Sequence, residues 1–292
     1  MKHLFLGAVA AFCILLLSCC KEVGPDINLH GNANSVSDTT YIAATVDTPG
    51  AKNVLVEEFT GVECPNCPAG HAVVAGIQAQ YATGRIAAIA MHPNNALGQP
   101  FQFSQQNLID ANSTSLLTYL GDPGFEPAGA VDRQLFSGQT TILTDRSYWA
   151  GFVQSEFALK PQVNILLSDQ YTTGSSQVTI IAEIHYTQAI SNPNNITIAL
   201  TEDSITTAQL DGSSIDTFYV HNNVLRTIIT GTTGDNVAYN SSVTLVPGRV
   251  VRLVYQTTLN SLWKPQHMHV VAFVHEHSTS QVVYQAAIIP LN

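Results

Sequence analysis

The chain has 292 residues, of which 45% are hydrophobic and only 11% are charged, and its formal net charge is −10. This length is sufficient for two hydrophobic cores, because single domains usually hold about 100–200 residues. An acidic chain repels phosphate groups, which excludes nucleic acid as a partner. The low charge content is typical of exported β-rich proteins.

The first residues have the pattern of a secretory signal. Lys2 precedes an apolar run over residues 4–17, and this run is too short to span a membrane. A leucine three positions before Cys19 and Ser18 directly before it resemble the bacterial lipobox, which implies cleavage after Ser18 and a diacylglyceryl group on Cys19. The neighbouring Cys20 is a poorer lipidation site, and an ordinary cleaved signal or an uncleaved anchor is the alternative interpretation.

Residues 19–50 form a predicted tether, rich in Gly, Asn, Asp, Ser and Thr, that leads into a first strand at 41–46. Strand and helix patterns then alternate as far as residue 160. The expected elements are strands at 54–59 and 86–91, helices at 69–81, 103–120 and 145–159, and a short strand within 125–133. This order predicts an α/β domain over residues 51–160 that begins with a β-α-β unit.

Beyond residue 161 the hydrophobic period changes to two. Alternate residues from Val178 to Tyr186 are apolar and are expected to face a core. Further strands are expected at 163–167, 196–201, 225–230, 250–257, 268–276 and 282–289. About seven strands separated by Gly, Asn and Ser turns predict an all-β sandwich over residues 161–292.

Cys64 and Cys67 lie between the strand at 54–59 and the helix at 69–81. A helix N-terminus stabilises a thiolate, and residues three apart in a helical turn come close enough for a disulfide. Outside the anchor these are the only cysteines of the mature chain. Because so short a loop stabilises folding little, the pair indicates a chemical role.

The segment over residues 54–67 resembles the strand, turn and active-site helix of the thioredoxin superfamily. This resemblance implies that Cys64 is the nucleophile and Cys67 the resolving thiol. It also implies that Glu58 is a buried acid that exchanges a proton with the resolving thiol, and that Pro127 is a cis-proline beside the cysteines. Strand alternation alone leaves open whether Glu57 or Glu58 points inward.

Two residues depart from that family pattern. Glu63 replaces an aromatic residue and places a carboxylate beside Cys64, and Pro68 disturbs the helix unless the helix starts at Cys67. Zinc binding is an alternative, since His71 and His92 could join the two cysteines. One cysteine pair falls short of the usual structural zinc site, so no metal and no cofactor is expected.

Residues 219–226 and 230–235 resemble a recurrent segment of Omp28-like outer-membrane lipoproteins of Bacteroidota-type bacteria. That resemblance covers essentially the mature chain. It implies a signal peptide at 1–18, a tether at 19–50, a thioredoxin-like domain at 51–160 and a β-sandwich domain at 161–292. It also implies an outer-membrane protein, anchored by lipid on Cys19, that faces either the periplasm or the cell surface.

These features favour two functions of different classes. The first is thiol–disulfide exchange by Cys64 and Cys67 on exported protein thiols, which would make the chain an oxidoreductase. The second is a non-enzymatic surface binding protein or adhesin, in which the fold is a scaffold and an unidentified surface ligand is the partner.

Overall fold

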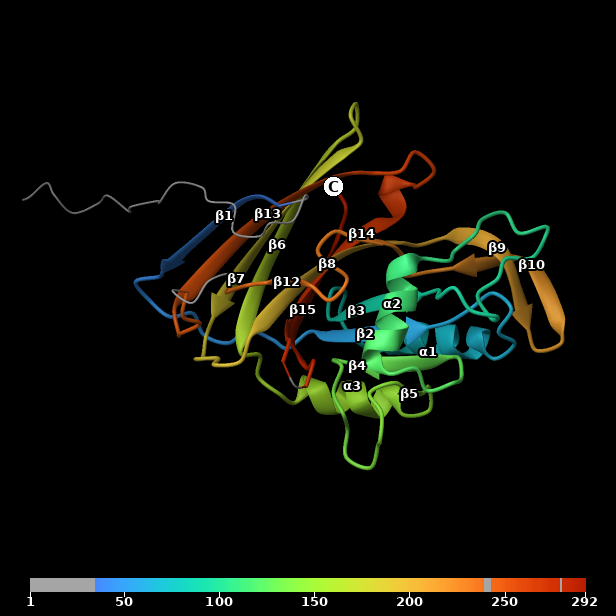
Figure 1. Cartoon of the computed structure of the whole chain (residues 1–292), viewed down its shortest axis with the longest axis horizontal. Helices are drawn as coiled ribbons and strands as arrows, with labels where there is room; N and C mark the ends of the chain where they lie inside the picture. The colour runs from blue at the N-terminus through green and yellow to red at the C-terminus, as the bar shows by residue number, and fades with distance from the viewer. Residues whose placement is uncertain (1–34, 239–242, 279) are drawn as a thin grey trace, which may run out of the picture.

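A computed structural model describes residues 35–238, 243–278 and 280–292 of the chain (Figure 1). The predicted signal peptide and the lipidation site at Cys19 lie outside the described residues. Within the described part the fold is predominantly β, with two larger sheets, one hairpin and three α-helices.

The largest sheet is mixed and runs through both halves of the chain. Its strand order is β15-β14-β8-β11-β3-β2-β4-β5, with β12 beside β8. The bounds are β2 (Val54–Phe59), β3 (Ile86–Met91), β4 (Ala128–Val131), β5 (Thr144–Asp145), β8 (Asn194–Glu202), β11 (Val224–Ile228), β12 (Asp235–Asn236), β14 (Met268–Glu276) and β15 (Val283–Pro290). Strand β11 pairs antiparallel with β8 and parallel with β3, which joins the two halves.

A second sheet packs on one part of the first to form a sandwich. It has the order β1-β13-β7-β6, from β1 (Ser35–Ile42), β6 (Val163–Thr172), β7 (Gln177–Tyr186) and β13 (Arg249–Thr258). The predicted alternation in β7 is confirmed, because its five inward residues from Val178 to Tyr186 are fully buried. They pack against residues of β8, β13 and β14 in one core.

The predicted fold class, a thioredoxin-like α/β domain followed by an all-β sandwich domain, is wrong. The described residues have a sandwich-like fold and contain no separate thioredoxin-like α/β domain, because β2, β3 and β4 share one sheet with β8, β11, β14 and β15. Hydrophobic periodicity identifies strands but does not reveal which sheet a strand joins. The predicted boundaries at residues 50 and 160 stay predictions.

Three helices cover β2, β3 and β4. On one face α1 (Cys67–Gln80) and α3 (Trp149–Phe157) bury Val74, Ile77 and Trp149, and on the other α2 (Ala111–Leu120) packs with β14 and β15. Helix α1 begins at Cys67, so Pro68 stands in the first turn where its missing N–H is tolerated. The helix expected at 103–120 is shorter, because Asp110 caps α2 by accepting from the Ser113 backbone N–H.

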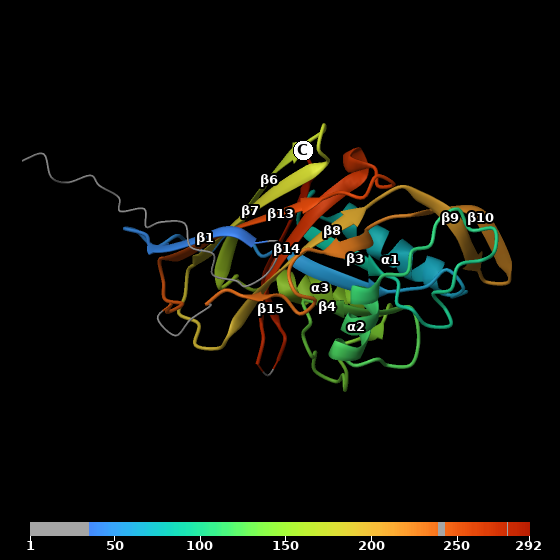
Figure 2. The ribbon, with the colours of Figure 1, turned by 45° about the horizontal axis from the view of Figure 1, so that its top comes forward.

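A β-hairpin of β9 (Ile205–Asp211) and β10 (Ser214–His221) was not predicted. In both views it lies at the end of the molecule away from the four-stranded sheet (Figures 1 and 2). Backbone hydrogen bonds from Leu210 N to Val62 O and from Gly212 N to Pro65 O fix it against the loop before α1. A short 3₁₀ helix, η1 (Pro265–His267), precedes β14.

A buried ion pair ties β4 to the centre of the sheet. Arg133 donates to both carboxylate oxygens of Glu57, at 2.8 and 2.6 Å, and both side chains are fully buried. The Arg133 guanidinium carbon also lies 4.8 Å from the centre of the Phe273 ring on β14. The pair therefore holds elements from both halves of the chain at once.

Replacing Arg133 with Met leaves the Glu57 carboxylate buried without its partner. We expect the free energy of unfolding to fall by about 3–5 kcal/mol in urea denaturation. The double variant Glu57→Leu/Arg133→Met removes both charges and is the matched control, expected to recover most of that loss. A loss below about 1 kcal/mol in the single variant would contradict a structural role for the pair.

Candidate functional site: a buried disulfide beside a histidine-lined pocket

Cys64 and Cys67 form a disulfide at the start of α1, with their Cα atoms 5.4 Å apart. Strand β2 ends at Phe59, and the loop that follows leads directly into the helix at Cys67. Because both sulfurs are bonded to each other, neither is a thiolate ligand for zinc in this state. The assignment of Cys64 as nucleophile and Cys67 as resolving thiol stays a prediction.

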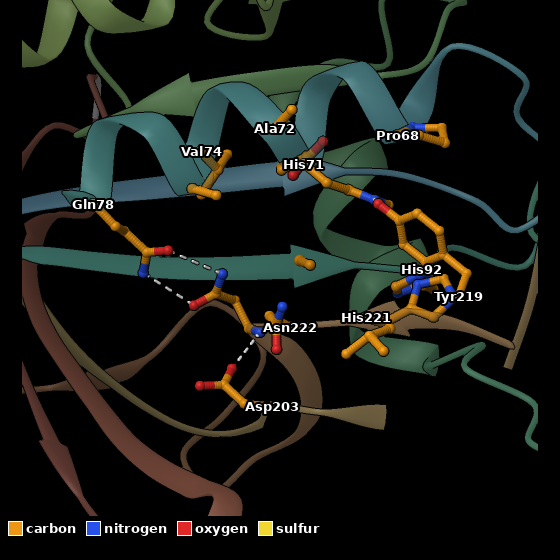
Figure 3. Close-up of a pocket in the computed structure, with 15 residues that line it drawn as sticks. Pro68, His71, Ala72, Val74, Gln78, His92, Asp203, Tyr219, His221 and Asn222 are labelled. Atoms are coloured by element: carbon orange, nitrogen blue, oxygen red, sulfur yellow. Dashed lines mark hydrogen bonds between the residues drawn. The ribbon is translucent and has the colours of Figure 1, made fainter. Parts of the chain in front are cut away.

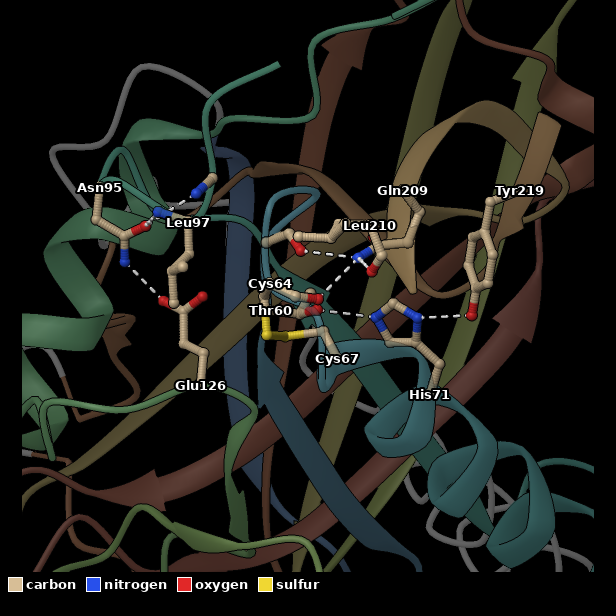
Figure 4. Close-up of a disulfide and its surroundings, with 12 residues drawn as sticks. Thr60, Cys64, Cys67, His71, Asn95, Leu97, Glu126, Gln209, Leu210 and Tyr219 are labelled. Atoms are coloured by element: carbon tan, nitrogen blue, oxygen red, sulfur yellow. Dashed lines mark hydrogen bonds between the residues drawn. A yellow bond between two sulfur atoms is a disulfide. The ribbon is translucent and has the colours of Figure 1, made fainter. Parts of the chain in front are cut away.

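The disulfide is buried and is not exposed to solvent. Cys64 is 1% exposed and Cys67 is 0% exposed. The amide of Gln209 on β9 donates to the carbonyls of Gly61 at 3.2 Å and Cys64 at 3.1 Å, which ties the hairpin to the loop that carries Cys64 (Figure 4). A backbone bond from Glu63 N to the carbonyl of Leu97, at 2.8 Å, ties the same loop to the segment that follows β3.

Glu57 and Glu58 are both buried, on opposite faces of β2. Glu57 pairs with Arg133, whereas one carboxylate oxygen of Glu58 has no hydrogen-bond partner among the described residues. Burial raises the pKa of Glu58 well above its usual range. Glu58 therefore favours the protonated, neutral form.

Pro127 lies close to Glu58 and α1, and the Glu126–Pro127 peptide bond is cis. A Cβ atom on Gly70 would meet Oε1 of Glu58 and Cβ of Pro127, the latter at 2.9 Å, so only glycine allows this approach. The structure thus brings Glu58 and Pro127 together beneath the helix that carries Cys67. The predicted catalytic roles of Glu58 and Pro127 stay predictions.

A pocket of about 330 Å³ lies between α1, the end of β3 and the β9–β10 hairpin (Figure 3). Glu58 reaches it from β2, and Pro68, the residue after Cys67, forms part of its wall. The pocket and the disulfide therefore share the first turn of α1.

Three histidines from three elements gather at this pocket: His71 from α1, His92 after β3 and His221 at the end of β10. The His221 ring centre lies 5.9 Å from each of the other two. His71 is held by hydrogen bonds to Thr60 Oγ1 at 2.8 Å and Tyr219 Oη at 2.9 Å. Both ring nitrogens of His92 and both of His221 have no hydrogen-bond partner among the described residues.

All three imidazoles favour the neutral form. Burial lowers the pKa of His71 to about 4 and that of His221 to about 3. Burial, and then the neighbouring His221 and His71, lower the pKa of His92 well below its usual range. Contacts with the backbone of Ala90 beside His92 and of Thr207 beside His221 oppose these shifts only in part and fall short of hydrogen-bond geometry.

The outer part of the pocket is polar and internally paired. Asp203 accepts from the Asn223 backbone N–H at 2.7 Å, and the Gln78 amide donates to the Asn223 side chain at 3.1 Å. The unpaired polar atoms are therefore concentrated at the inner end, around His92 and His221.

Sequence reasoning found only part of this constellation. His71 and His92 were noted as conceivable zinc ligands, but Gln209, Tyr219 and His221 lie on a hairpin that was not predicted. Alternating Ile205, Thr207 and Gln209 gave a weak strand signal that could have identified β9. Across the described ranges, no group of three or more His, Cys, Asp and Glu residues is placed to hold a metal ion.

Residues 88–290, more than half of the chain, match the family described as "Outer membrane protein Omp28". The chain belongs to the Omp28 family. This membership confirms the family resemblance predicted from the sequence and the predicted location at the outer membrane, and it agrees with a lipid anchor. The residue that carries the lipid, predicted as Cys19, is not among the described residues. No helix within the described ranges has the length and apolarity needed to cross a membrane.

Solved structures extend the comparison to the fold. HBP35 of Porphyromonas gingivalis is 20% identical, with a TM-score of 0.64 over 84% of this chain and 77% of that chain, so the two share a fold. A domain of the outer membrane lipoprotein Omp28 from Porphyromonas gingivalis is 18% identical, at a TM-score of 0.32 over 45% of this chain and 89% of that chain. A collagen-binding domain from a Staphylococcus aureus adhesin is 11% identical, at a TM-score of 0.21 over 43% of this chain and 94% of that chain. The last two scores carry no argument about fold or function. No curated protein matches the chain.

Replacing Gln209 with Ala removes the amide that fastens the hairpin to the loop carrying Cys64. Because a net hydrogen bond is worth about 1 kcal/mol, we expect reduction of the disulfide by a phosphine reductant to become roughly fivefold faster. The readout is free thiol counted by mass against time. Gln170→Ala, an exposed glutamine on β6, is the matched control and leaves the rate unchanged. An unchanged rate in Gln209→Ala would show that the hairpin does not protect the bond.

Proposed function

We propose that this Omp28-family protein is a non-enzymatic binding protein of the outer membrane, and that the pocket between α1 and the β9–β10 hairpin holds its ligand. One observation carries this proposal: the pocket has unpaired polar atoms at its inner end, whereas the neighbouring disulfide is buried. Buried polar groups are normally paired, so such atoms favour an incoming partner.

The burial of Cys64 argues against exchange with protein substrates. Thiol–disulfide exchange requires a thiolate to reach a sulfur atom along the bond axis, and reactive cysteines are accordingly exposed. At 1% exposure Cys64 offers no such approach. In the proposed function the disulfide instead fixes the turn from which Pro68 and His71 enter the pocket.

Thiol–disulfide exchange is kept as a second candidate because of Glu58. A neutral carboxyl group beneath the start of α1 is suited to giving a proton to a thiolate released at Cys67. This candidate requires the β9–β10 hairpin to open before a substrate can reach Cys64. The two candidate functions therefore differ in whether a substrate can reach the sulfur atom of Cys64.

The variant Cys67→Ala, in a mature chain whose Cys19 and Cys20 are changed to Ser, leaves Cys64 as a single thiol. We expect this thiol to react with oxidised glutathione at least tenfold more slowly in the folded protein than in urea, because the hairpin covers it. Mixed disulfide is measured by intact mass. Rapid formation of a stable mixed disulfide in the folded protein would favour the exchange function instead.

The variant Ala75→Phe places an aromatic ring in the pocket from the exposed side of α1, and Ala79→Phe, one turn further and outside the pocket, is its matched control. The assay screens a library of neutral, acidic and basic fragments by saturation-transfer NMR. We expect the fragments that bind the wild type to lose their signals with Ala75→Phe and to keep them with Ala79→Phe. Signals that survive Ala75→Phe would show that the pocket is not the binding site.

A further inference from the structure

The inner end of the pocket presents three buried groups that need hydrogen-bond partners. His92 is 1% exposed, His221 is 2% exposed and Glu58 is 3% exposed. All four ring nitrogens of the two histidines and Oε1 of Glu58 have no hydrogen-bond partner among the described residues. A buried polar atom without a partner is costly, so a ligand that pairs these atoms gains affinity from each of them.

These groups would be paired by a ligand that both donates and accepts hydrogen bonds. A neutral imidazole carries one N–H donor and one acceptor nitrogen, and a protonated carboxyl group carries one O–H donor and a carbonyl acceptor. A hydroxyl group satisfies either kind of atom, because it donates one hydrogen and accepts through two lone pairs. Several hydroxyl groups on one small molecule would therefore match this end of the pocket whichever ring nitrogens carry the protons.

Among the described residues, the inner end of the pocket offers no free charge to an ionic ligand. Arg226, the cation that acts electrostatically on His92, donates to Glu202 at 2.7 Å and is held by it. The acid at the rim, Asp203, is occupied by Asn223 and lies 3.7 Å from His269 Nδ1. A charged group at the inner end, beside His92 and His221, would lose hydration without gaining a counter-ion, which disfavours it relative to a neutral group.

The remaining wall suits a small ligand with an apolar face. Pro68, Ala72 and Ala75 line the side made by α1, and the half-buried Tyr219 lines the side made by β10. A volume of about 330 Å³ is at the lower end of small-molecule sites and corresponds to about eleven water molecules. A pyranose sugar, with about twelve non-hydrogen atoms and C–H groups on one face, is of this size and kind.

We propose that the ligand of this pocket is an uncharged polyhydroxyl molecule of monosaccharide size, bound through His92, His221 and Glu58. The inference rests on the proposed binding function and adds the chemical class of the ligand. The hydroxyl groups pair the histidine nitrogens and the carboxyl group, and the C–H face packs on Tyr219 and the alanines of α1.

The test is saturation-transfer NMR with matched neutral and charged sugars on the whole mature protein. The neutral probes are glucose, galactose and N-acetylglucosamine, and the charged counterparts are glucuronate and glucosamine. We expect at least one neutral sugar to bind with a Kd of about 1 mM or tighter, and its charged counterpart to bind at least tenfold more weakly. Equal or tighter binding of the charged sugar overturns the proposal, and so does the absence of binding by every neutral probe.

Two variants tie the result to the pocket. His221→Phe removes two of the unpaired nitrogens and is expected to weaken binding of the neutral sugar at least tenfold. The control His277→Phe changes an exposed histidine after β14 and is expected to leave the affinity for the sugar unchanged. Ala75→Phe blocks the same pocket from an exposed position, so the test stands even if His221→Phe does not fold. A neutral sugar that still binds to Ala75→Phe overturns the assignment to this pocket.

Other outcomes separate this inference from the proposed function. Stoichiometric binding of Zn²⁺ that is lost in His221→Phe would assign the imidazoles to a metal and overturn the sugar class. If library fragments bind the wild type but not Ala75→Phe, while no sugar binds, the proposed binding function stands and only the proposed sugar ligand is overturned. The absence of any ligand that depends on the pocket would overturn both.

Discussion

The main sheet is continuous across both halves of the chain because β11 pairs with a strand on each side. Val224 pairs antiparallel with Glu202 on β8 and parallel with Ala90 on β3, and Ala90 N donates to Asn223 O at 2.7 Å. A parallel and an antiparallel ladder meet on this one strand. Because backbone groups in a sheet are costly to leave unpaired, breaking this pairing would expose the edges of both halves.

The pocket follows from that pairing. Residues 203–223 leave β8, form the β9–β10 hairpin and return directly to β11, so the hairpin is anchored at both ends where the two halves meet. It crosses to α1, where its backbone bonds to Val62 and Pro65 and its Gln209 amide bonds to Cys64. The same crossing that ties the hairpin to the loop carrying Cys64 brings Tyr219 and His221 to the helix, which is why the two features lie side by side.

Local patterns in the sequence predicted the elements that have one strong period. The strands at Val54–Phe59 and Ile86–Met91 were predicted with their observed bounds, and the inward row of β7 was predicted residue by residue. Pairing between distant strands has no such local signal, so the pairing of β11 on both sides and the shared sheet were not predictable. The β9–β10 hairpin was missed because β10 is largely exposed and half of its residues are polar, without a strict alternation of polar and apolar positions.

Two adjacent glutamates on β2 illustrate why burial, more than residue type, decides what a side chain does here. Glu57 faces Arg133 and is neutralised by a bidentate ion pair that ties β4 and β14 to the sheet centre. Glu58, one residue on, faces α1, meets no cation, and has its pKa raised by burial alone. Of the two carboxyl groups in this buried strand, that of Glu57 therefore makes a structural ion pair and that of Glu58 is a neutral hydrogen-bonding group. The neutral one lies against the helix that carries Cys67 and lines the pocket, so any function of the pocket has to accommodate an uncharged acid at that point.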